Sequence, residues 1–583
     1  MFISFACRFC TFRDSIKQNV LIYRMYIGHR KEKESLRAVH NAFRVLSSYT
    51  IANRVILCSM SDVIANVSLK TNCSSVSLPS LRSKKKTIDQ ILWIVAAMWD
   101  FIQTILRGIQ LTCTFTPLVI LYPLTKMNRN IRHIWYNMLL IGINFSGPII
   151  IKFGQWASTR RDIFSEELCF YLAKLQRKTT PHSWYYTEKC LENAYGSKWK
   201  DIFVGFDNRG QPIGSGCCAQ VYKAWIKKEN IPKCSSNKEQ HMELKNFSFV
   251  EVMEMLGLGY FTTYSGKTAF HQGMGNVIPV AVKVQHPQME KRFRQDLNIL
   301  KFLANTITWL LPSLRWLSLC ECVDDFSQVM KSQVNFFTEA ENLKQFADHF
   351  KNSSSIQFPT PFDSLTRSYI LIETFEEGKH IDDFIALDLN KQTKKDLAVL
   401  GVNTVLKMVF EDNFFHGDLH PGNMLVQEKI ISNHLWKMPF HPVFKTTMEP
   451  TLVILDCGIV ASLDERGKKC LKDVFAAVAR ADGERVAELF LLHSNHECHD
   501  IQSFKEAMKE IVEKALSKQV TLHQVDVSVL MNSLFSTMIT HKVKVDSSFS
   551  SVILAIMVIE GLGRSLDPSI DILERAKPFL FAL

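Results

Sequence analysis

The stretch His416-Gly-Asp-Leu-His-Pro-Gly-Asn423 decides how the rest of this 583-residue chain is interpreted. It places a carboxylate, Asp418, five residues before an amide, Asn423. A carboxylate can orient or deprotonate a hydroxyl, and an amide oxygen is a ligand that Mg²⁺ accepts. Alone, such a string also fits an ordinary loop that caps a helix, so its meaning depends on the motifs around it.

A second polar motif, Leu455-Asp-Cys-Gly458, follows downstream. The apolar run Leu452–Leu455 leads into it and predicts a short buried strand. Asp456 would then stand at the end of that strand as a second oxygen ligand for Mg²⁺. We expect Gly458 to supply the turn, since glycine adopts conformations that other residues avoid. The pattern therefore predicts a metal site formed by Asn423 and Asp456.

Two upstream motifs complete the pattern of a phosphoryl-transfer site. Val280-Ala-Val-Lys283 is an alternating apolar run that ends in a lysine suited to binding phosphates. Gly214-Ser-Gly-Cys-Cys-Ala-Gln-Val221 fits G-x-G-x-x-A-x-V, a loop that covers phosphates, with its third glycine replaced. Its candidate nucleotide-binding residues are Gly214, Ser215, Gly216, Ala219 and Val221. In this order the four motifs predict an α+β, two-lobed, protein-kinase-like fold that uses ATP and Mg²⁺.

A helix predicted at about 327–349 supplies the partner of the lysine. Glu339 lies on this helix and is the natural partner of Lys283, because such an ion pair positions the lysine for the phosphates. Asn335 stands four residues before Glu339, so we expect the two side chains to share a face. Asp418 would position or deprotonate the nucleophile, whether water or a hydroxyl.

Charge is concentrated at the N-terminus. Residues 1–90 hold 15 Lys/Arg against 5 Asp/Glu, whereas the whole chain has a net charge of +12. The body is therefore close to neutral, which argues against a nucleic-acid groove. Basic residues mixed with apolar ones and few acids are typical of a mitochondrial presequence, although a disordered basic tail has the same composition. The Ser-rich residues 71–87 read as a linker.

Residues 108–125 carry no charge, and Arg107 and Lys126 flank them. Eighteen residues is the lower limit for a helix that spans a membrane, and Pro117 and Pro123 weaken that interpretation. A helix in the membrane interface and a buried helix stay open as alternatives. We expect residues 88–126 to be associated with a membrane.

The region before the phosphate loop reveals a family resemblance. Lys152-Phe-Gly-Gln155 precedes Ser158-Thr-Arg-Arg-Asp162, and ordinary protein kinases have nothing equivalent there. With the motifs above, this resembles the UbiB family of atypical kinases, the aarF-domain-containing proteins, over residues 146–568, and an animal branch most of all. The resemblance implies a location in mitochondria or plastids and a role in ubiquinone and isoprenoid-lipid metabolism. It also implies that the K-x-G-Q helix lies across the site where a kinase receives a peptide, so that Lys152 and Gln155 gate access.

The chain departs from the family pattern at two places. Gln333 and Asn335 stand where the family has an acidic pair, so we expect a weaker hold on Lys152. Gly214-Ser-Gly-Cys217 replaces the family's alanine run, which makes this loop more like that of an ordinary kinase. We therefore expect weaker autoinhibition than in relatives that keep the acids.

The sequence thus predicts a mitochondrial, inner-membrane-associated kinase or ATPase. Its expected partners are ATP, membrane or isoprenoid lipids and ubiquinone-biosynthesis proteins. A Ser/Thr protein kinase and a nucleotide-binding scaffold without useful turnover are the alternatives. The expected domains are a targeting region and linker (1–87), a membrane-associated helical segment (88–126), a helical extension (127–211), an N-lobe (212–375) with an insertion at about 227–277, and a C-lobe (376–583).

Overall fold

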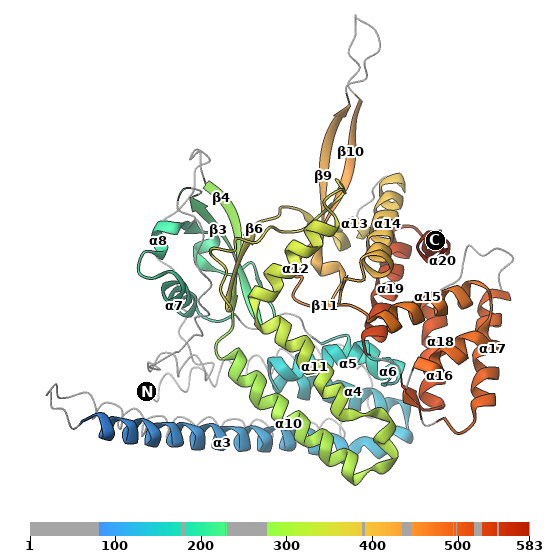
Figure 1. Ribbon diagram of the computed structural model, residues 1–583, viewed down its shortest axis with the longest axis horizontal. Coiled ribbons are helices and arrows are strands. Elements are labelled where there is room, and N and C mark those ends of the chain that lie inside the picture. Colours follow the sequence, from blue (N-terminus) through green and yellow to red (C-terminus); the bar gives the residue numbers. More distant parts are fainter. Residues whose placement is uncertain are drawn as a thin grey trace, which may run out of the picture. The chain divides into compact units, whose positions relative to one another are not determined.

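The computed structural model describes residues 81–161, 163–175, 181–227, 229, 277–386, 391–433, 445–493, 495–496, 498–517, 527–544 and 547–581 (Figure 1). Nearly all of the predicted targeting region and most of the predicted insertion at 227–277 lie outside these residues. The chain divides into two units, Met1–Thr116 and Pro117–Leu583. The second unit contains both lobes.

The helix α3 (Leu81–Leu121) is 41 residues long and contains Pro117. The segment Ala97–Lys126, which ends with the 3₁₀ helix η1 (Tyr122–Lys126), is long and apolar enough to cross a membrane, and little of it is buried. Length and composition agree with the expected membrane segment. They do not distinguish a spanning helix from one that lies in the interface, so the membrane association stays a prediction.

Short helices precede the first sheet, and side-chain caps set where several of them begin. Asn128 accepts a hydrogen bond from the Asn130 amide at the start of α4, and Ser165 and Ser183 cap α6 and α7 in the same way. Gly147, at φ 93°, leads into α5, whose first residue is Pro148. The helices are α4 (Arg129–Phe145), α5 (Pro148–Thr159), α6 (Glu166–Leu172), α7 (Trp184–Tyr195) and α8 (Trp199–Ile202).

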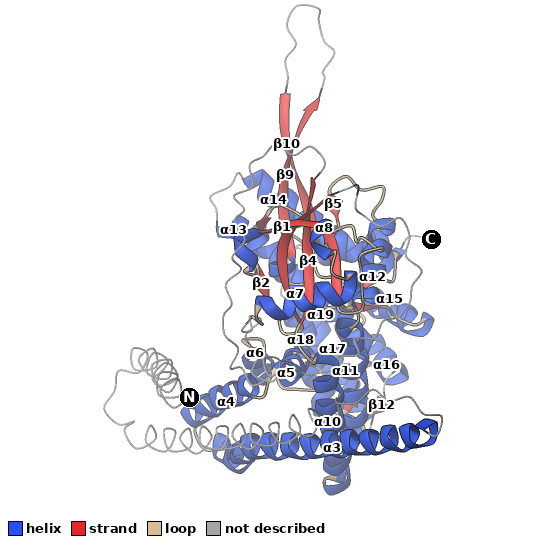
Figure 2. Cartoon of the chain, turned by 90° about the vertical axis from the view of Figure 1, so that its left-hand side faces the viewer, coloured by secondary structure: helices blue, strands red, loops and turns tan. Residues whose placement is uncertain are grey.

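The N-lobe contains a five-stranded antiparallel sheet, drawn in red among the helices in Figure 2. Its strands are β1 (Phe203–Phe206), β2 (Gly214–Ser215), β3 (Ala219–Lys227), β4 (Val277–Gln285) and β6 (Ile370–Thr374). They run in the order β1-β3-β4-β6, and β2 pairs with β3. One face of the sheet forms an apolar core with α7 and α8, and it carries Tyr222, Ala224, Ile226, Val280, Val282, Val284, Ile370 and Ile372. Because side chains alternate along a strand, Lys283 faces the other way.

Four helical segments follow β4 and precede the edge strand β6 of this sheet. They are α10 (Met289–Leu310), η4 (Pro312–Leu317), α11 (Leu319–Val334) and α12 (Phe336–His349). The single helix predicted at 327–349 is wrong, because the chain breaks at Asn335, which is extended at φ −112° and ψ 106°. Its side-chain oxygen accepts a hydrogen bond from the Phe337 amide and so caps α12. Asn335 therefore lies outside the helix that carries Glu339, and the two do not share a helical face.

The C-lobe combines a four-stranded sheet with a helical layer. The strand order is β5-β10-β9-β7, in which β10 pairs parallel with β5 and antiparallel with β9. A second pair, β8 with β11, carries the loop of the first motif, and β12 (Asn495–His496) pairs with β13 (Val543–Lys544). The strands are β5 (Ile356–Gln357), β7 (Lys379–His380), β8 (Phe415–His416), β9 (Met424–Asn433), β10 (Lys445–Ile454) and β11 (Val460–Ala461).

The helices of the C-lobe enclose the largest apolar core among the described residues. The apolar helix α19 lies in this core and packs on α14, where the Cβ that Gly401 lacks would be 3.2 Å from the Ile559 side chain. Its residues Ser548–Leu566 also pass the length and composition test for a membrane helix, but most of them are buried in the lobe. The helices are α13 (Ile381–Ala386), α14 (Lys391–Leu406), the π-helical η5 (Lys407–Glu411), α15 (Glu465–Ala479), α16 (Gly483–His493), α17 (Ile501–Ser517), α18 (Val527–Thr540), α19 (Ser547–Leu566) and α20 (Ile572–Phe581).

Candidate active site

A lysine held by two carboxylates forms the centre of the site. Lys283, on β4, donates from Nζ to Glu339 Oε1 and Oε2, at 2.8 and 3.0 Å, and to Asp456 Oδ1 at 2.7 Å. Glu339 lies in the first turn of α12 and its side chain is only 2% exposed, whereas that of Asp456 is 46% exposed. The structure thus brings together three of the residues that the sequence proposed, from three distant elements.

The pKa values of this cluster follow from burial and from the shared ammonium group. Burial alone would lower the pKa of Lys283, but the Asp456 and Glu339 carboxylates outweigh it and raise that pKa. Burial also raises the pKa of Glu339, which the Lys283 ammonium opposes, while the same ammonium holds the pKa of Asp456 below its usual range despite burial. The cluster therefore keeps a charged lysine and a charged Asp456 at neutral pH.

The turn that carries Asp456 differs from the expected one. Asp456 itself has φ 54°, in the left-handed region, whereas Gly458 does not have a positive φ. The prediction that Gly458 supplies the unusual backbone conformation is therefore wrong. The Asn342 side chain donates to the Cys457 carbonyl at 2.9 Å and holds the turn in place. A non-glycine residue in this region is uncommon and costs some backbone strain, which is typical of functional sites.

The loop of the first motif is organised around His416. The Asp418 amide donates to His416 Nδ1 at 3.1 Å, and His416 Nε2 donates to the Leu455 carbonyl at 3.3 Å. The Asn423 side-chain nitrogen donates to the Asp418 carbonyl at 3.3 Å, and the Leu455 amide donates to the Asn423 carbonyl at 2.8 Å. These bonds tie the Asp418 loop to the strand that leads into Asp456.

This arrangement fits a magnesium ion. Because the nitrogen of the Asn423 amide is already used, its side-chain oxygen is the atom left to act as a ligand. The Asp456 carboxylate is the other candidate, and both offer the oxygen donors that Mg²⁺ prefers. Asp456 accepts a hydrogen bond from Lys283 through Oδ1, and its side chain is 46% exposed, so its carboxylate would still be accessible to the metal.

Lys152 contacts the carboxylate that the sequence assigned to the nucleophile. It lies on α5, and its Nζ is 3.6 Å from Asp418 Oδ2. Burial would lower the pKa of Lys152, but Asp418, together with smaller effects of Cys218, Cys217 and Asp456, raises it. The acidic partner of Lys152 is therefore on the Asp418 loop. Gln155 lies on the same helix, and within the described parts of the chain its side chain has no hydrogen bond to Lys283, Asp418 or Asp456.

The phosphate loop is a tight hairpin between β2 and β3. Gly214 pairs with Val221, and the Gly216 amide donates to the Ala219 carbonyl at 2.9 Å. Neither glycine has a positive φ, so the loop does not use that freedom of glycine. A Cβ at Gly214 would meet no atom within 4 Å, and one at Gly216 only the Ala219 carbonyl at 3.6 Å. The space beside both glycines is open to a ligand.

The remaining candidates of this loop lie beside the lysine or close to it. Val221 is directly opposite Lys283 across the β3–β4 ladder, and Ala219 is buried. Ser215 pairs with Gln220 in the hairpin. The loop residue Cys218 donates from Sγ to Gln333 Oε1 at 3.9 Å, so the first amide of the altered family pair contacts the phosphate loop.

A further carboxylate, Glu373 on β6, escaped the sequence analysis. It pairs in register with Ala281, which lies two residues before Lys283, so all three side chains share the cleft face of the sheet. Burial raises the pKa of Glu373 to about 8, and the neighbouring Glu339 adds to this. Glu373 is thus mostly protonated at neutral pH and can donate a hydrogen bond in the cleft. A carboxylate directly after the apolar run Ile370–Ile372 was the signal that could have identified it.

Two half-buried histidines support the phosphate loop, and the sequence analysis missed them as well. His286 Nε2 donates to the Gly216 carbonyl at 2.9 Å, which leaves its Nδ1 as an acceptor. His182 Nδ1 donates to this atom at 2.8 Å. Burial lowers the pKa of both imidazoles, so both are neutral at neutral pH. No sequence motif links two histidines that are 104 residues apart.

The chain of hydrogen bonds continues into the sheet. His182 Nε2 accepts from the Thr187 hydroxyl at 2.9 Å, which in turn accepts from the Tyr222 hydroxyl at 2.7 Å. Tyr222 accepts from the Gln220 side-chain nitrogen, and the Gln220 oxygen accepts from the His182 amide at 2.9 Å. All donors point the same way along the chain. This network fixes the Gly216 carbonyl relative to α7 and the sheet.

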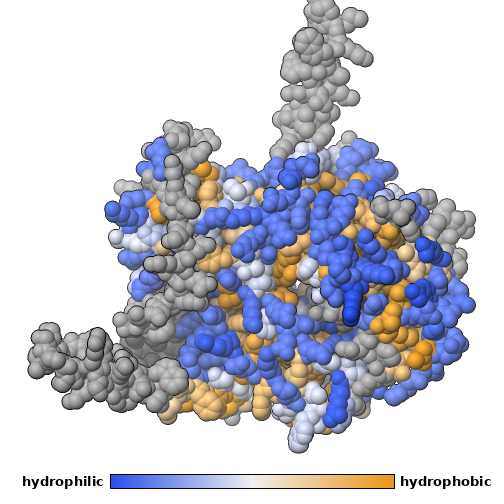
Figure 3. Space-filling view, viewed as in Figure 1, coloured by the Kyte–Doolittle hydropathy of each residue, from blue (hydrophilic) through white to orange (hydrophobic). Residues whose placement is uncertain are grey.

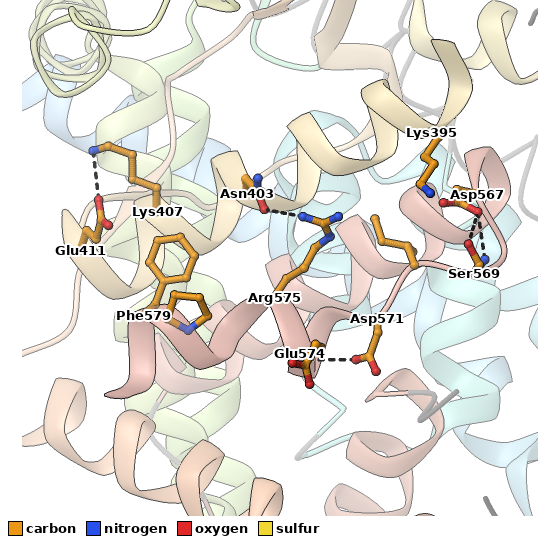
Figure 4. Close-up of a pocket in the computed structure, with 12 residues that line it drawn as sticks. Lys395, Asn403, Lys407, Glu411, Asp567, Ser569, Asp571, Glu574, Arg575 and Phe579 are labelled. Carbon is orange, nitrogen blue, oxygen red and sulfur yellow. Dashed lines mark hydrogen bonds and ion pairs between the residues drawn. The ribbon is translucent and has the colours of Figure 1, made fainter. Parts of the chain in front are cut away.

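A cavity of about 750 Å³ lies elsewhere, between α14, η5 and α20 in the C-lobe (Figure 4). Its charged lining residues mostly have partners: Arg575 reaches Asn403 at 3.5 Å, and Asp567 accepts from Ser569 at 2.7 Å. None of the residues proposed from the sequence lines it. The face of the protein that Figure 3 shows is mostly hydrophilic, and apolar residues reach its surface in several separate places.

Comparisons with known proteins agree with this arrangement. The ABC1 atypical kinase-like domain matches residues 269–490, and the UbiB helical domain matches residues 508–571. A mitochondrial ABC1 family protein of Saccharomyces cerevisiae is 31% identical over 82% of this chain and 74% of its own length. The chain belongs to the ABC1/UbiB family of atypical kinases. The resemblance drawn from the motifs is thus confirmed at the family level, and the kinase-like fold with it.

Other relatives extend the comparison. A mitochondrial ABC1 family protein of Schizosaccharomyces pombe is 30% identical over 82% of this chain and 71% of its own length. A Tolumonas auensis protein named probable protein kinase UbiB is 27% identical over 79% of this chain and 71% of its own. Among solved structures, Rv3197 of Mycobacterium tuberculosis, in complex with erythromycin, matches with a TM-score of 0.39 and 16% identity over 71% of this chain and 91% of its own. The animal branch stays a prediction.

Proposed function

We propose that this protein is an ATP- and Mg²⁺-dependent atypical kinase or ATPase. The observation that supports this most directly is Lys283, held by Glu339 and Asp456 beside an open phosphate loop. When bound, Mg²⁺ supplies positive charge that neutralises the phosphates. Lys283 would bind phosphate oxygens, Glu339 would keep this lysine in position, and Asn423 and Asp456 would hold the metal.

Asp418 would position the attacking hydroxyl or water. Its carboxylate lies 3.6 Å from Lys152, so an acceptor has to compete with this ammonium group. A bulky peptide hydroxyl is at a greater disadvantage than water or a small acceptor. The contact therefore supports ATP hydrolysis, or transfer to a small molecule, over the alternative of a Ser/Thr protein kinase. An intact set of Lys283, Asp418, Asn423 and Asp456 also argues against a scaffold without turnover.

The cellular setting belongs to the same proposal. The fungal relatives are named mitochondrial and the bacterial one UbiB. Together with the basic N-terminus, these names support action in mitochondria, in ubiquinone and lipid metabolism. Membrane or isoprenoid lipids and ubiquinone-biosynthesis proteins are the partners we propose, and we propose the inner membrane as the location.

ATP turnover by the purified full-length protein tests the catalytic proposal. Release of ADP and phosphate is measured with and without vesicles and isoprenoid precursors, and transfer of labelled phosphate to added proteins is measured in parallel. We expect hydrolysis that Lys283→Met abolishes and that the exposed control Lys331→Met on α11 leaves unchanged. Transfer to proteins without hydrolysis would favour the Ser/Thr kinase, and MgATP binding without either would favour the scaffold.

A further inference from the structure

The helical hairpin formed by α10 and α11 ends in an apolar tip, Lys301–Trp316. Six large apolar side chains of this tip are between 37% and 76% exposed: Phe302, Leu303, Ile307, Trp309, Leu310 and Leu311. The hairpin does not need them for its own packing, because a different set of residues, including Leu297, Ala304 and Phe326, forms its core. An exposed cluster of this kind marks an interaction surface.

The charge of the tip indicates what it meets. Between Asp296 and Glu321 the chain has no acidic residue, and its charged residues are Lys301 and Arg315. Lys301 pairs with Asp324 on α11 at 2.5 Å, whereas Arg315 is exposed. Asp324 thus neutralises Lys301, Arg315 is the cation that the tip presents to solvent, and the segment Lys301–Trp316 itself contains no acidic residue. This charge complements a surface of anionic headgroups.

The polar groups of the tip are satisfied internally. The Thr306 hydroxyl donates to the Phe302 carbonyl at 2.8 Å, and the Thr308 hydroxyl donates to the Ala304 carbonyl at 2.8 Å. Cys320 Sγ donates to Asn305 Oδ1 at 3.1 Å and so ties α11 to α10. Polar groups that enter a lipid environment must find partners within the protein, since no water is available there. The tip meets this requirement at each of these side chains.

The turn after α10 follows the same rule. The Leu311 amide donates to the Ile307 carbonyl at 2.8 Å, and the Leu314 amide donates to the Leu311 carbonyl at 3.0 Å. Trp309 and Trp316 lie at its two ends, and tryptophan prefers the boundary between headgroups and acyl chains. A helical end with exposed apolar side chains, tryptophans and internally paired polar groups fits the interface of a bilayer.

We propose that the Lys301–Trp316 tip inserts into the interface of an anionic lipid bilayer. The exposed apolar side chains would enter the acyl boundary, while Arg315 and Lys301 would remain at the headgroups. This contact is independent of ATP chemistry, and it does not depend on whether Ala97–Lys126 also spans a membrane. Its test therefore needs a readout that reports on the tip alone.

Photolabelling of the full-length protein by lipids gives such a readout. The protein is bound to vesicles of phosphatidylcholine and phosphatidylglycerol that contain a lipid with a diazirine in its acyl chain. After irradiation, trypsin cleaves at Lys301 and Arg315 and releases the peptide Phe302–Arg315. We expect lipid adducts on this peptide. The peptide Val486–Lys505 is the matched control, because it carries Leu492, which is 74% exposed, and should stay unlabelled.

Two variants sharpen the test. Trp309→Ser combined with Leu310→Ser removes exposed apolar surface and should lower the adduct yield about tenfold or more, with an unchanged melting temperature. Vesicles of phosphatidylcholine alone should label the tip several-fold less. A vesicle-bound protein without adducts on Phe302–Arg315, or with equal labelling of the control peptide, would overturn the proposal. So would failure to bind the vesicles, or equal labelling in neutral vesicles.

Discussion

Replacing Lys152 by methionine tests how strongly α5 restrains the carboxylate of Asp418. The change keeps the length of the side chain and removes the ammonium group 3.6 Å from Asp418. Coulomb's law gives this pair about 5 kcal/mol at an effective dielectric constant of 20 and about 1 kcal/mol in bulk water. Because the Asp418 side chain is 40% exposed, solvent screens the pair and a value of about 1–2 kcal/mol is appropriate.

If Lys152 competes with acceptors for Asp418, losing it should speed transfer to a hydroxyl acceptor by about five- to thirty-fold. The assay is autophosphorylation and transfer to a generic peptide, measured with labelled ATP. The Kd for MgATP, for which we propose Lys283 and Asp456 as binding residues, should stay within about twofold, since one weak contact is all that is removed. Lys331→Met, on the exposed side of α11, is the control for loss of a lysine.

Two results would refute this reasoning. Unchanged transfer with unchanged MgATP affinity would show that the Lys152–Asp418 contact does not restrain catalysis. A marked loss of MgATP affinity would show that Lys152 binds the nucleotide instead. In the second case Lys152 on α5 would bind phosphate, and the proposed gating role would be wrong.

The remaining predictions concern the metal, a buried carboxyl and the altered family pair. Asp456→Asn should abolish the Mg²⁺-dependent part of thermal stabilisation by ATP, because an amide does not balance the metal charge, and unchanged stabilisation would remove Asp456 from the metal site. Burial raises the pKa of Glu373 to about 8, so wild type should lose stability as the pH rises from about 4.5 to 8. Melting temperatures at pH 5 and 8 should show a smaller loss for Glu373→Gln, and equal losses would contradict the shift. Gln333→Glu adds a carboxylate beside Cys218 and should lower basal ATP turnover a few-fold, whereas Asn335→Asp keeps a helix cap and should change little. Equal effects of these last two variants would refute the prediction that losing the acid at position 333 weakens autoinhibition.

The strands around the lysine could be predicted because local signals and fold agree there. Val280–Lys283 alternates with a period of two, and the same period places Lys283 on the cleft face of β4. Glu339 could be predicted as the acid on the helix that follows the Lys283 strand, and the structure brings it to the lysine. For both residues, a short stretch of sequence is enough to predict the direction in which the side chain points.

Other features depend on tertiary contacts that the sequence does not display. The break at Asn335 divides a stretch whose periodicity favours one helix, and the asparagine serves both as an end and as a cap. Asp456 has a positive φ, and Asn342 on α12 holds its turn through the Cys457 carbonyl. The sequence does not show this contact, so the turn was wrongly assigned to Gly458. The partner of Lys152 lies 266 positions away in sequence, on Asp418.

The one-way order of hydrogen-bond donation from Gln220 through Tyr222, Thr187 and His182 to His286 has a consequence for the evolution of the protein. Each member accepts from one neighbour and donates to the next, so a substitution at one position leaves the next without its donor or acceptor. Replacements that look conservative, such as Tyr222→Phe, would leave the Gln220 amide without its acceptor and the Thr187 hydroxyl without its donor. Among orthologues these five positions should therefore change together or not at all, and their covariation would record the network independently of any structure.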